Sequence, residues 1–184
     1  MKQIVFVTGN QGKWKVANDI FVEYGLELLQ NKTEIPEIQS LDVVEVAKFS
    51  AEFAAQKLQT AVMVSDVGYY FNALNGFPGP FVKYLNHVLC PDDILRLMSG
   101  QVDRSVVLRE CLAYAVPNGK IITLVSEQQA TLAFAPQGTG STMDQLLILD
   151  GFDKPKGVYS DEEIFEHWKR TLDAYHRLAV KIKE

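Results

Sequence analysis

The order of apolar and polar residues near the start of the sequence predicts a strand, a helix and a second strand. Ile4-Val5-Phe6-Val7 is a near-continuous apolar run, typical of a strand buried on both faces. From Gln11 to about Tyr24, apolar residues recur every three or four positions, which predicts an amphipathic helix with Asn10 as its N-cap. A second strand is expected from Leu26 to Gln30.

The same alternation of strand and helix continues to the middle of the chain. Asp42 and Glu45 have the spacing of an acidic capping box and precede an amphipathic pattern that reaches Leu58. The short apolar run Ala61-Val62-Met63-Val64 predicts a buried strand that ends at Asp66. This order of elements favours an α/β sheet with helices on both faces.

The remaining sequence predicts shorter elements and a long hairpin. Two short helices are expected between Phe81 and Met98. Two β-rich runs, 105–116 and 120–134, meet at Pro117-Asn118-Gly119, a hairpin turn signature. Ser160 and Glu163 form a capping box before one final helix, 164–182. Together the patterns predict an α/β protein with a mixed, twisted central sheet and one domain over residues 1–184.

Composition is that of an ordinary globular protein. The 184 residues are 47% hydrophobic and 22% charged, which suits one core. A net charge of −5, with scattered Lys and Arg, argues against a polynucleotide partner. Cys90 and Cys111 lack metal-site spacing, and no apolar run has membrane length, so we expect a cytoplasmic protein with reduced thiols and no membrane partner.

Three segments are candidates for chemistry. Thr8-Gly9-Asn10 with Lys13 combines a glycine turn, a helix N-terminus and a positive charge, which suits an anion, although most such turns simply cap a helix. Glu37 follows Ile35-Pro36 in an expected loop. Asp66 precedes the stiff loop Gly76-Phe77-Pro78-Gly79-Pro80, and the alternative interpretation is an ordinary strand, a capping aspartate and a turn.

These three segments, taken in order, resemble the Ham1/inosine triphosphate pyrophosphatase family. The similarity covers Ile4 to about Leu85 and is weaker beyond. It implies an ITPase-like fold, with two lobes around a cleft and the hairpin extending one lobe. The implied activity is hydrolysis of non-canonical purine nucleoside triphosphates (ITP, XTP, dITP) to the monophosphate and pyrophosphate. Family members commonly form homodimers around the Gly-Pro loop, so a homodimer is expected.

The resemblance also implies roles for individual residues. Thr8, Gly9, Asn10 and Lys13 would hold the triphosphate. Glu37 would bind Mg²⁺, and Asp66 would activate water. We also expect Glu37 and Asp66 to hold Mg²⁺ as a pair, with phosphate oxygens completing the coordination shell of the ion.

Further along the chain, the resemblance assigns Asp144 to base recognition and retains His167 near the substrate. The chain departs from the family at several positions. Ser65 replaces the acid before Asp66, and Ser141, Thr142 and Gln145 replace the aromatics and the proline of the base pocket. Ser50 and Glu162 replace two phosphate-binding lysines, and Trp168 replaces an arginine.

Two hypotheses stay open at this point. Glu37, Asp66 and Lys13 favour an active pyrophosphatase with changed base preference, whereas Ser50, Glu162 and the loss of the arginine favour a weakened or inactive nucleotide-binding homologue. A Maf-type pyrophosphatase is disfavoured because the sequence lacks a Ser-x-Ser-Pro-Arg-Arg-like start. For His167 the alternative interpretation is a polar residue on a helix face.

Overall fold

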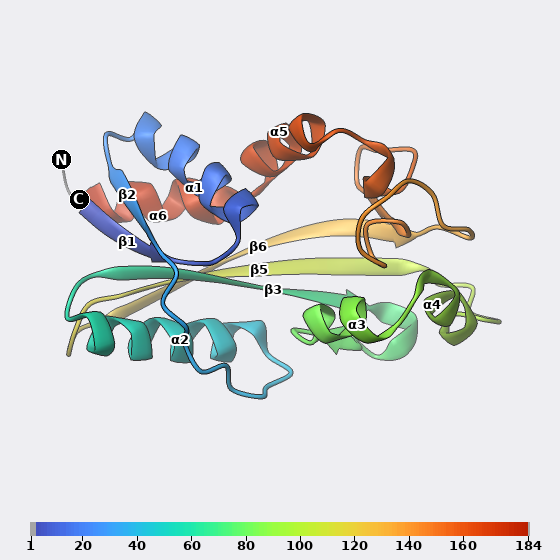
Figure 1. The fold of residues 1–184 in the computed structure, drawn as a ribbon, viewed down its shortest axis with the longest axis horizontal. Helices are drawn as coiled ribbons and strands as arrows, with labels where there is room; N and C mark the ends of the chain where they lie inside the picture. The colour runs from blue at the N-terminus through green and yellow to red at the C-terminus, as the bar shows by residue number, and fades with distance from the viewer. Residues whose placement is uncertain (1–2, 184) are drawn as a thin grey trace. The chain divides into compact units, whose positions relative to one another are not determined.

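The computed structural model describes residues 3–183. The chain forms two compact units, which are described separately. Within the described residues, the first unit contains the chain up to Asp66, Glu110–Ser126 and everything from Phe165 onward, and the second contains Val67–Arg109 and Glu127–Ile164. Sheet strands follow the hydrogen-bonded order β2-β1-β3-β5-β6-β7, with β4 paired to β3 (Figure 1).

The first unit is built on parallel strands at its N-terminal end. β1 pairs in parallel with β2, Gln3 opposite Glu27, and with β3, Val5 opposite Val62. Its elements are β1 (Gln3–Val7), α1 (Gln11–Glu23), β2 (Glu27–Asn31), α2 (Val43–Leu58), α6 (Asp173–Lys183) and parts of β3 (Val62–Phe71), β5 (Ser105–Ala115), β6 (Ile121–Leu132) and α5 (Asp161–Thr171).

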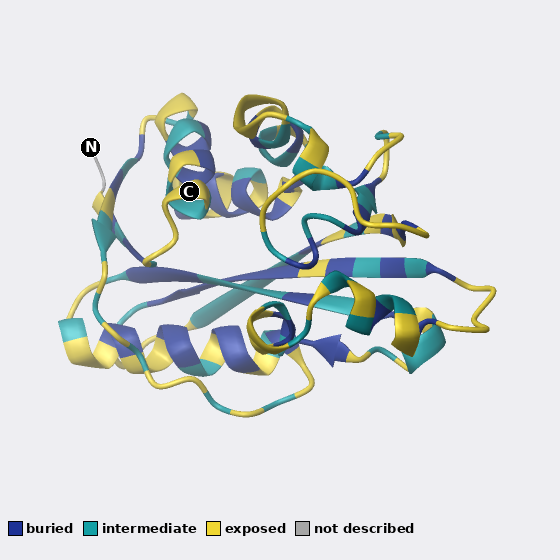
Figure 2. Ribbon diagram, turned by 45° about the vertical axis from the view of Figure 1, so that its right-hand side comes forward, coloured by how far each residue is buried: buried dark blue, intermediate teal, exposed yellow. Residues whose placement is uncertain are grey.

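Two apolar clusters lie on opposite faces of these strands. One joins α1 and α6 to Ile4, Phe6 and Met63. The other joins α2 to Val7 and Val62. Alternate residues of a strand point to opposite faces, so both faces of the sheet are covered, and the inward face of α2 is buried along its length (Figure 2). The predicted α/β sheet with helices on both faces is confirmed.

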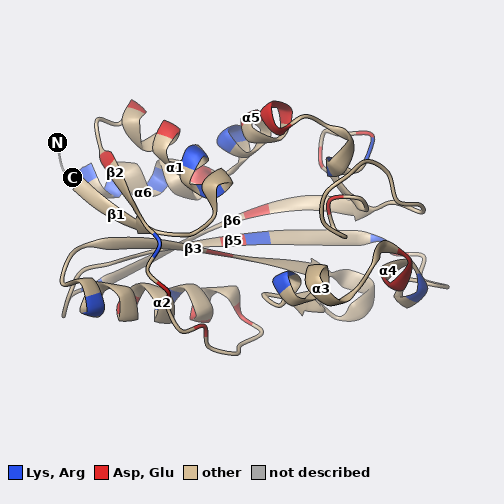
Figure 3. Ribbon diagram, viewed as in Figure 1, with Lys and Arg blue, Asp and Glu red and all other residues tan. Residues whose placement is uncertain are grey.

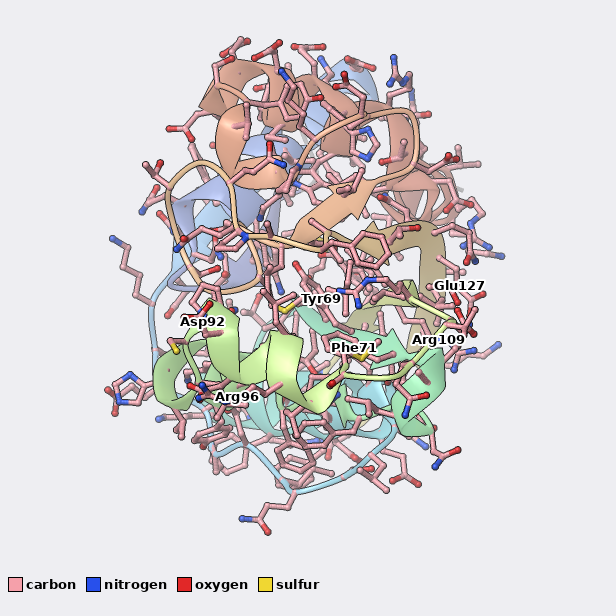
Figure 4. The ribbon with its side chains drawn as sticks, turned by 90° about the vertical axis from the view of Figure 1, so that its right-hand side faces the viewer. Tyr69, Phe71, Asp92, Arg96, Arg109 and Glu127 are labelled. Carbon is pink, nitrogen blue, oxygen red and sulfur yellow. The ribbon has the colours of Figure 1, made fainter. Side chains whose placement is uncertain are left out.

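The second unit is largely antiparallel. β3 pairs with β4 (Pro78–Gly79) and β6 pairs with β7 (Leu147–Leu149), both antiparallel. Arg109 Nε lies 2.7 Å from Glu127 Oε1, an ion pair between the parts of β5 and β6 in this unit (Figure 4). The remaining elements are α3 (Val82–Val88), α4 (Pro91–Leu97), the start of α5, and two 3₁₀ turns, Asn72–Leu74 and Lys156–Val158.

Two predicted boundaries were wrong. β3 does not end at Asp66 but continues to Phe71, because β5 is also its neighbour in the sheet and β4 pairs with Tyr69 and Tyr70. The final helix is two helices, α5 and α6, interrupted at Leu172. The Ser126 hydroxyl accepts from the Ala174 N–H at 2.8 Å and donates to Asp173 Oδ1 at 2.7 Å, so a residue of β6 caps the start of α6.

Other local predictions hold. Asn10 caps α1, Asp42 caps α2 through the Val44 N–H at 2.8 Å, and the Ser160–Glu163 box is formed. Glu45 bonds Ser40 instead of completing a box with Asp42. Figure 3 shows that acidic and basic residues are distributed over the elements of each unit. Among the described residues, no helix has the length and apolarity needed to cross a bilayer.

Candidate active site

The loop between β1 and α1 is held in a defined conformation by its own polar groups. The Asn10 N–H donates to the Thr8 hydroxyl at 3.1 Å, and Asn10 Oδ1 accepts from the Lys13 N–H at 3.0 Å. The N–H groups of Gln11 and Gly12 open the helix and therefore have no intrahelical acceptor. No heavy atom would lie within 4 Å of a Cβ at Gly9, so the loop leaves room for a ligand.

The Lys13 side chain connects this loop to β3. Its ammonium donates to the backbone carbonyl of Ser65 at 3.2 Å, next to Asp66 in the sequence. Pairing with β1 covers Val62 and Met63 of β3, and β1 ends at Val7. The Ser65 carbonyl therefore lies beyond the part of β3 that pairs with β1, where Lys13 of α1 can reach it. The structure brings Thr8, Asn10, Lys13 and the segment before Asp66 together.

The two candidate metal-binding carboxylates belong to the same unit. Asp66 is half-buried on β3, and Glu37 is exposed in the loop between β2 and α2. This loop leaves β2 at the edge where the Thr8 N–H donates to the Asn31 carbonyl at 2.9 Å, which is also where β1 meets the loop that leads to α1. Glu37 therefore lies in the loop after β2, and Asp66 lies within β3, and both of these strands pair in parallel with β1.

Carboxylate oxygens suit Mg²⁺, which keeps several waters and takes few protein ligands. Within residues 3–183, no group of three or more His, Cys, Asp or Glu side chains is arranged to hold a metal ion. Glu37 and Asp66 each supply carboxylate oxygens, the donor type that Mg²⁺ prefers.

Asp144 lies in the second unit and has a partner there. Lys156 Nζ is 2.5 Å from Asp144 Oδ1, and the Ser141 N–H donates to Oδ2 at 2.9 Å. Burial raises the pKa of Asp144, but the Lys156 ammonium and the Ser141 bonds outweigh it, and the pKa is lowered overall. The carboxylate assigned to base recognition is thus ionised and held by a lysine that the sequence patterns did not single out.

His167 lies in α5 and is buried, with its ring edge-on to the Trp168 ring at 5.1 Å between centroids. Trp168 packs against the first apolar cluster. Ser50 is buried within α2, and Glu162 is exposed in the first turn of α5. His167 therefore has the surroundings of a core residue of the first unit.

Sequence reasoning missed a second polar group in the first unit. Glu110 of β5 is only 8% exposed and accepts from the Tyr175 hydroxyl at 2.7 Å and from the Ser65 hydroxyl. The only sequence signal for it is a charged residue between Arg109 and Cys111 within an otherwise apolar half-strand.

Comparison with known sequences gives a consistent result. A family model described as the Ham1 family matches residues 4–172. The chain is 38% identical over 178 residues to a dITP/XTP pyrophosphatase of Methanosarcina mazei, covering 95% of this chain and 96% of that protein. It is 34% identical over 162 residues to a dITP/XTP pyrophosphatase of Methanopyrus kandleri, covering 88% and 86%.

Solved structures show the same fold at lower identity. A HAM1 protein from Coxiella burnetii matches with a TM-score of 0.82 and 18% identity, covering 99% of this chain and 98% of that one. The Staphylococcus aureus Ham1 protein matches with a TM-score of 0.79 and 21% identity over the same shares of the two chains.

Proposed function

Because the chain belongs to the Ham1 family, we propose that it hydrolyses non-canonical purine nucleoside triphosphates of the dITP/XTP type to the monophosphate and pyrophosphate. The observation that carries the proposal is the bond from Lys13 to the Ser65 carbonyl, because it joins the anion-binding loop to the segment that carries Asp66. Relatives named dITP/XTP pyrophosphatase support the substrate class.

In the proposed reaction, water attacks the α-phosphorus, the bond to the bridging oxygen breaks, and pyrophosphate leaves. The N–H groups at the start of α1 and the Lys13 ammonium bind the phosphates, since a helix N-terminus and a cation both favour negative charge. Asp66 orients the water and accepts its proton.

Glu37 and Asp66 would hold Mg²⁺ together with the substrate, which agrees with the preference of this ion for oxygen donors. When bound, the ion would neutralise charge that develops on the phosphates.

Asp144 and His167 remain candidates for contact with the nucleotide. The Lys156 pair argues that Asp144 acts as an ionised, positioned acceptor rather than as a proton donor. A catalytically inactive nucleotide-binding homologue is the alternative, and the altered residues Ser50 and Glu162 support it.

The test measures pyrophosphate release from dITP, XTP, ITP and the four standard triphosphates, with and without Mg²⁺. We expect turnover of the non-canonical purines, dependence on the metal, and a fall of at least about a hundredfold in kcat for Asp66→Asn with an unchanged Tm. A variant that keeps the full rate would remove Asp66 from the mechanism. Nucleotide-dependent Tm increases without turnover would favour the inactive homologue.

A further inference from the structure

A buried carboxylate of β5 is bonded to the strand that carries the candidate catalytic aspartate. Glu110 is 8% exposed, and one of its oxygens, Oε1, accepts from both the Tyr175 hydroxyl, at 2.7 Å, and the Ser65 hydroxyl. Tyr175 belongs to α6 and is itself fully buried. Burial, followed by the charge of Glu110, raises the pKa of Tyr175 well above its usual value, so its hydroxyl stays protonated as a donor.

The side chains of Ser65 and Glu110 lie on the face of the sheet that α1 covers. Side chains two positions apart on a strand share a face, so Ser65 shares that of Met63 and Glu110 that of Leu112. Met63 and Leu112 both belong to the apolar cluster formed with α1 and α6. Glu110 is therefore a charged group within the cluster that supports the helix of the anion loop.

Ser65 is the link between this carboxylate and Lys13. Its hydroxyl is bound by Glu110, and its carbonyl accepts from the Lys13 ammonium at 3.2 Å. This part of β3 lies past its pairing with β1 and has β5 as its neighbour in the sheet, so the Ser65–Glu110 bond adds a side-chain constraint to the contact between β3 and β5. A hydrogen bond to an ionised acceptor is about twice as strong as a neutral one, and a buried charge is costly to leave unbonded. Both effects hold Ser65 in one position.

We propose that Glu110 is a positioning residue for the reaction. By binding the Ser65 hydroxyl it fixes the Ser65 carbonyl, and this carbonyl holds the Lys13 ammonium next to Asp66. The inference rests on the proposed function. It differs from a purely structural role for Glu110, in which the carboxylate would only accept hydrogen bonds from the hydroxyls of Tyr175 and Ser65.

A double-mutant cycle separates the two roles. If Glu110 acts through Lys13, Glu110→Gln lowers kcat/KM about three- to tenfold in the native background and has little further effect in a Lys13→Ala background. If Glu110 is only structural, the two changes multiply, and that result overturns the proposal.

Two variants of Ser65 give a second test that does not require Glu110→Gln to fold. Ser65→Ala removes the hydroxyl and should lower kcat/KM as Glu110→Gln does, whereas Ser65→Thr retains a hydroxyl and should recover most of the activity. The matched control is Ser126→Ala, which removes a buried serine hydroxyl elsewhere in the same unit and should lower Tm without changing KM. Equal kinetics for Ser65→Ala and the native protein would contradict the proposal.

Calorimetric titration with inorganic tripolyphosphate provides a readout that needs no turnover. If the native protein releases no pyrophosphate, the proposed function fails, while coupling between Glu110 and Lys13 in the affinity for tripolyphosphate still supports the positioning role. The positioning role is overturned if turnover is uncoupled or absent and, in addition, the four members of the cycle bind tripolyphosphate equally well. It is also overturned if turnover is uncoupled or absent and none of the four has a measurable affinity.

Discussion

The Lys156 ammonium lies 2.5 Å from a carboxylate oxygen of Asp144, and only 20% and 26% of the two side chains are exposed. The structure therefore assigns Asp144 a partner within its own unit, in addition to any contact with a nucleotide. A pair of charges that is mostly removed from water depends on both members, because the loss of one leaves the other desolvated and unpaired.

Replacement of Asp144 by Asn should lower the free energy of unfolding by about 2 to 3 kcal/mol, somewhat less than for a fully buried pair. Urea denaturation measures this. The double variant Asp144→Asn/Lys156→Met should lose less stability than the sum of the single variants, since it removes both charges. Strict additivity would show that the pair contributes nothing specific.

The stability difference between the native protein and Asp144→Asn should also depend on pH. Although burial raises the pKa of Asp144, Lys156 lowers it overall, so its contribution is present above the unfolded-state pKa of about 3.9 and is lost as pH falls through the lower folded value. Burial lowers the pKa of Lys156, but Tyr69 and Asp144 raise it overall, so its contribution is lost at the alkaline end, as pH rises through the folded value. Denaturation midpoints across the pH range should show a plateau between these limits; a difference that vanishes near neutral pH would contradict the assignment.

Lys13 and Lys15 form a matched pair for testing the anion loop. Lys13 reaches Ser65, whereas the Lys15 ammonium lies 4.0 Å from the centroid of the Phe165 ring. Lys13→Ala should lower kcat/KM about ten- to a hundredfold, the effect expected for a charged hydrogen bond. Lys15→Ala should leave steady-state kinetics close to native. Equal losses for both variants would mean that general positive charge on α1, rather than the position of Lys13, is what matters.

The two cysteines should differ in reactivity. Cys90 is exposed, whereas Cys111 is fully buried, and burial followed by the charges of Asp66, Asp42 and Glu110 raises its pKa to about 12. At pH 8 a thiol reagent such as DTNB should therefore modify one thiol per native chain and two in guanidinium chloride. Cys90→Ser should abolish the native signal; rapid modification of Cys111 would show that β5 opens readily.

Removal of the Ser126 hydroxyl should destabilise the start of α6. Ser126→Ala leaves the Ala174 N–H without its acceptor, which should cost about 1 to 2 kcal/mol, in the range of lost helix caps. Thermal unfolding by circular dichroism measures the change. Ser126→Thr retains the hydroxyl and serves as the control; an equal loss in both variants would point to packing rather than capping.

Local sequence patterns predicted the elements whose causes are local. The β1–α1 turn, the α2 cap at Asp42 and the β5–β6 hairpin each depend on residues within one turn or one strand, and the structure contains them. The end of β3 was mispredicted because its length depends on β5 and β4, which supply partners from further along the chain. The start of α6 is capped by Ser126, which is distant in sequence, so the local pattern did not signal it.

The candidate site also contains both contacts that local sequence patterns predict and contacts that they do not. The grouping of Thr8, Asn10 and Lys13 follows from helix capping and could be predicted. The bonds of Glu110 to Ser65 and of Lys156 to Asp144 join separate elements, and no periodicity or spacing signals them. Charged residues that become buried through tertiary structure are therefore the part of this site that sequence patterns could not supply.

The loop that carries Asp144 has a further consequence for protein engineering. A Cβ on Gly157 would lie 2.2 Å from the Thr139 carbonyl oxygen, and one on Gly138 would lie equally close to the Gly157 carbonyl, at a residue with φ of +77°. The Thr139 N–H also donates to that carbonyl at 2.9 Å. Libraries directed at this loop should therefore keep both glycines fixed, because a side chain at either position would displace the backbone that leads to Asp144.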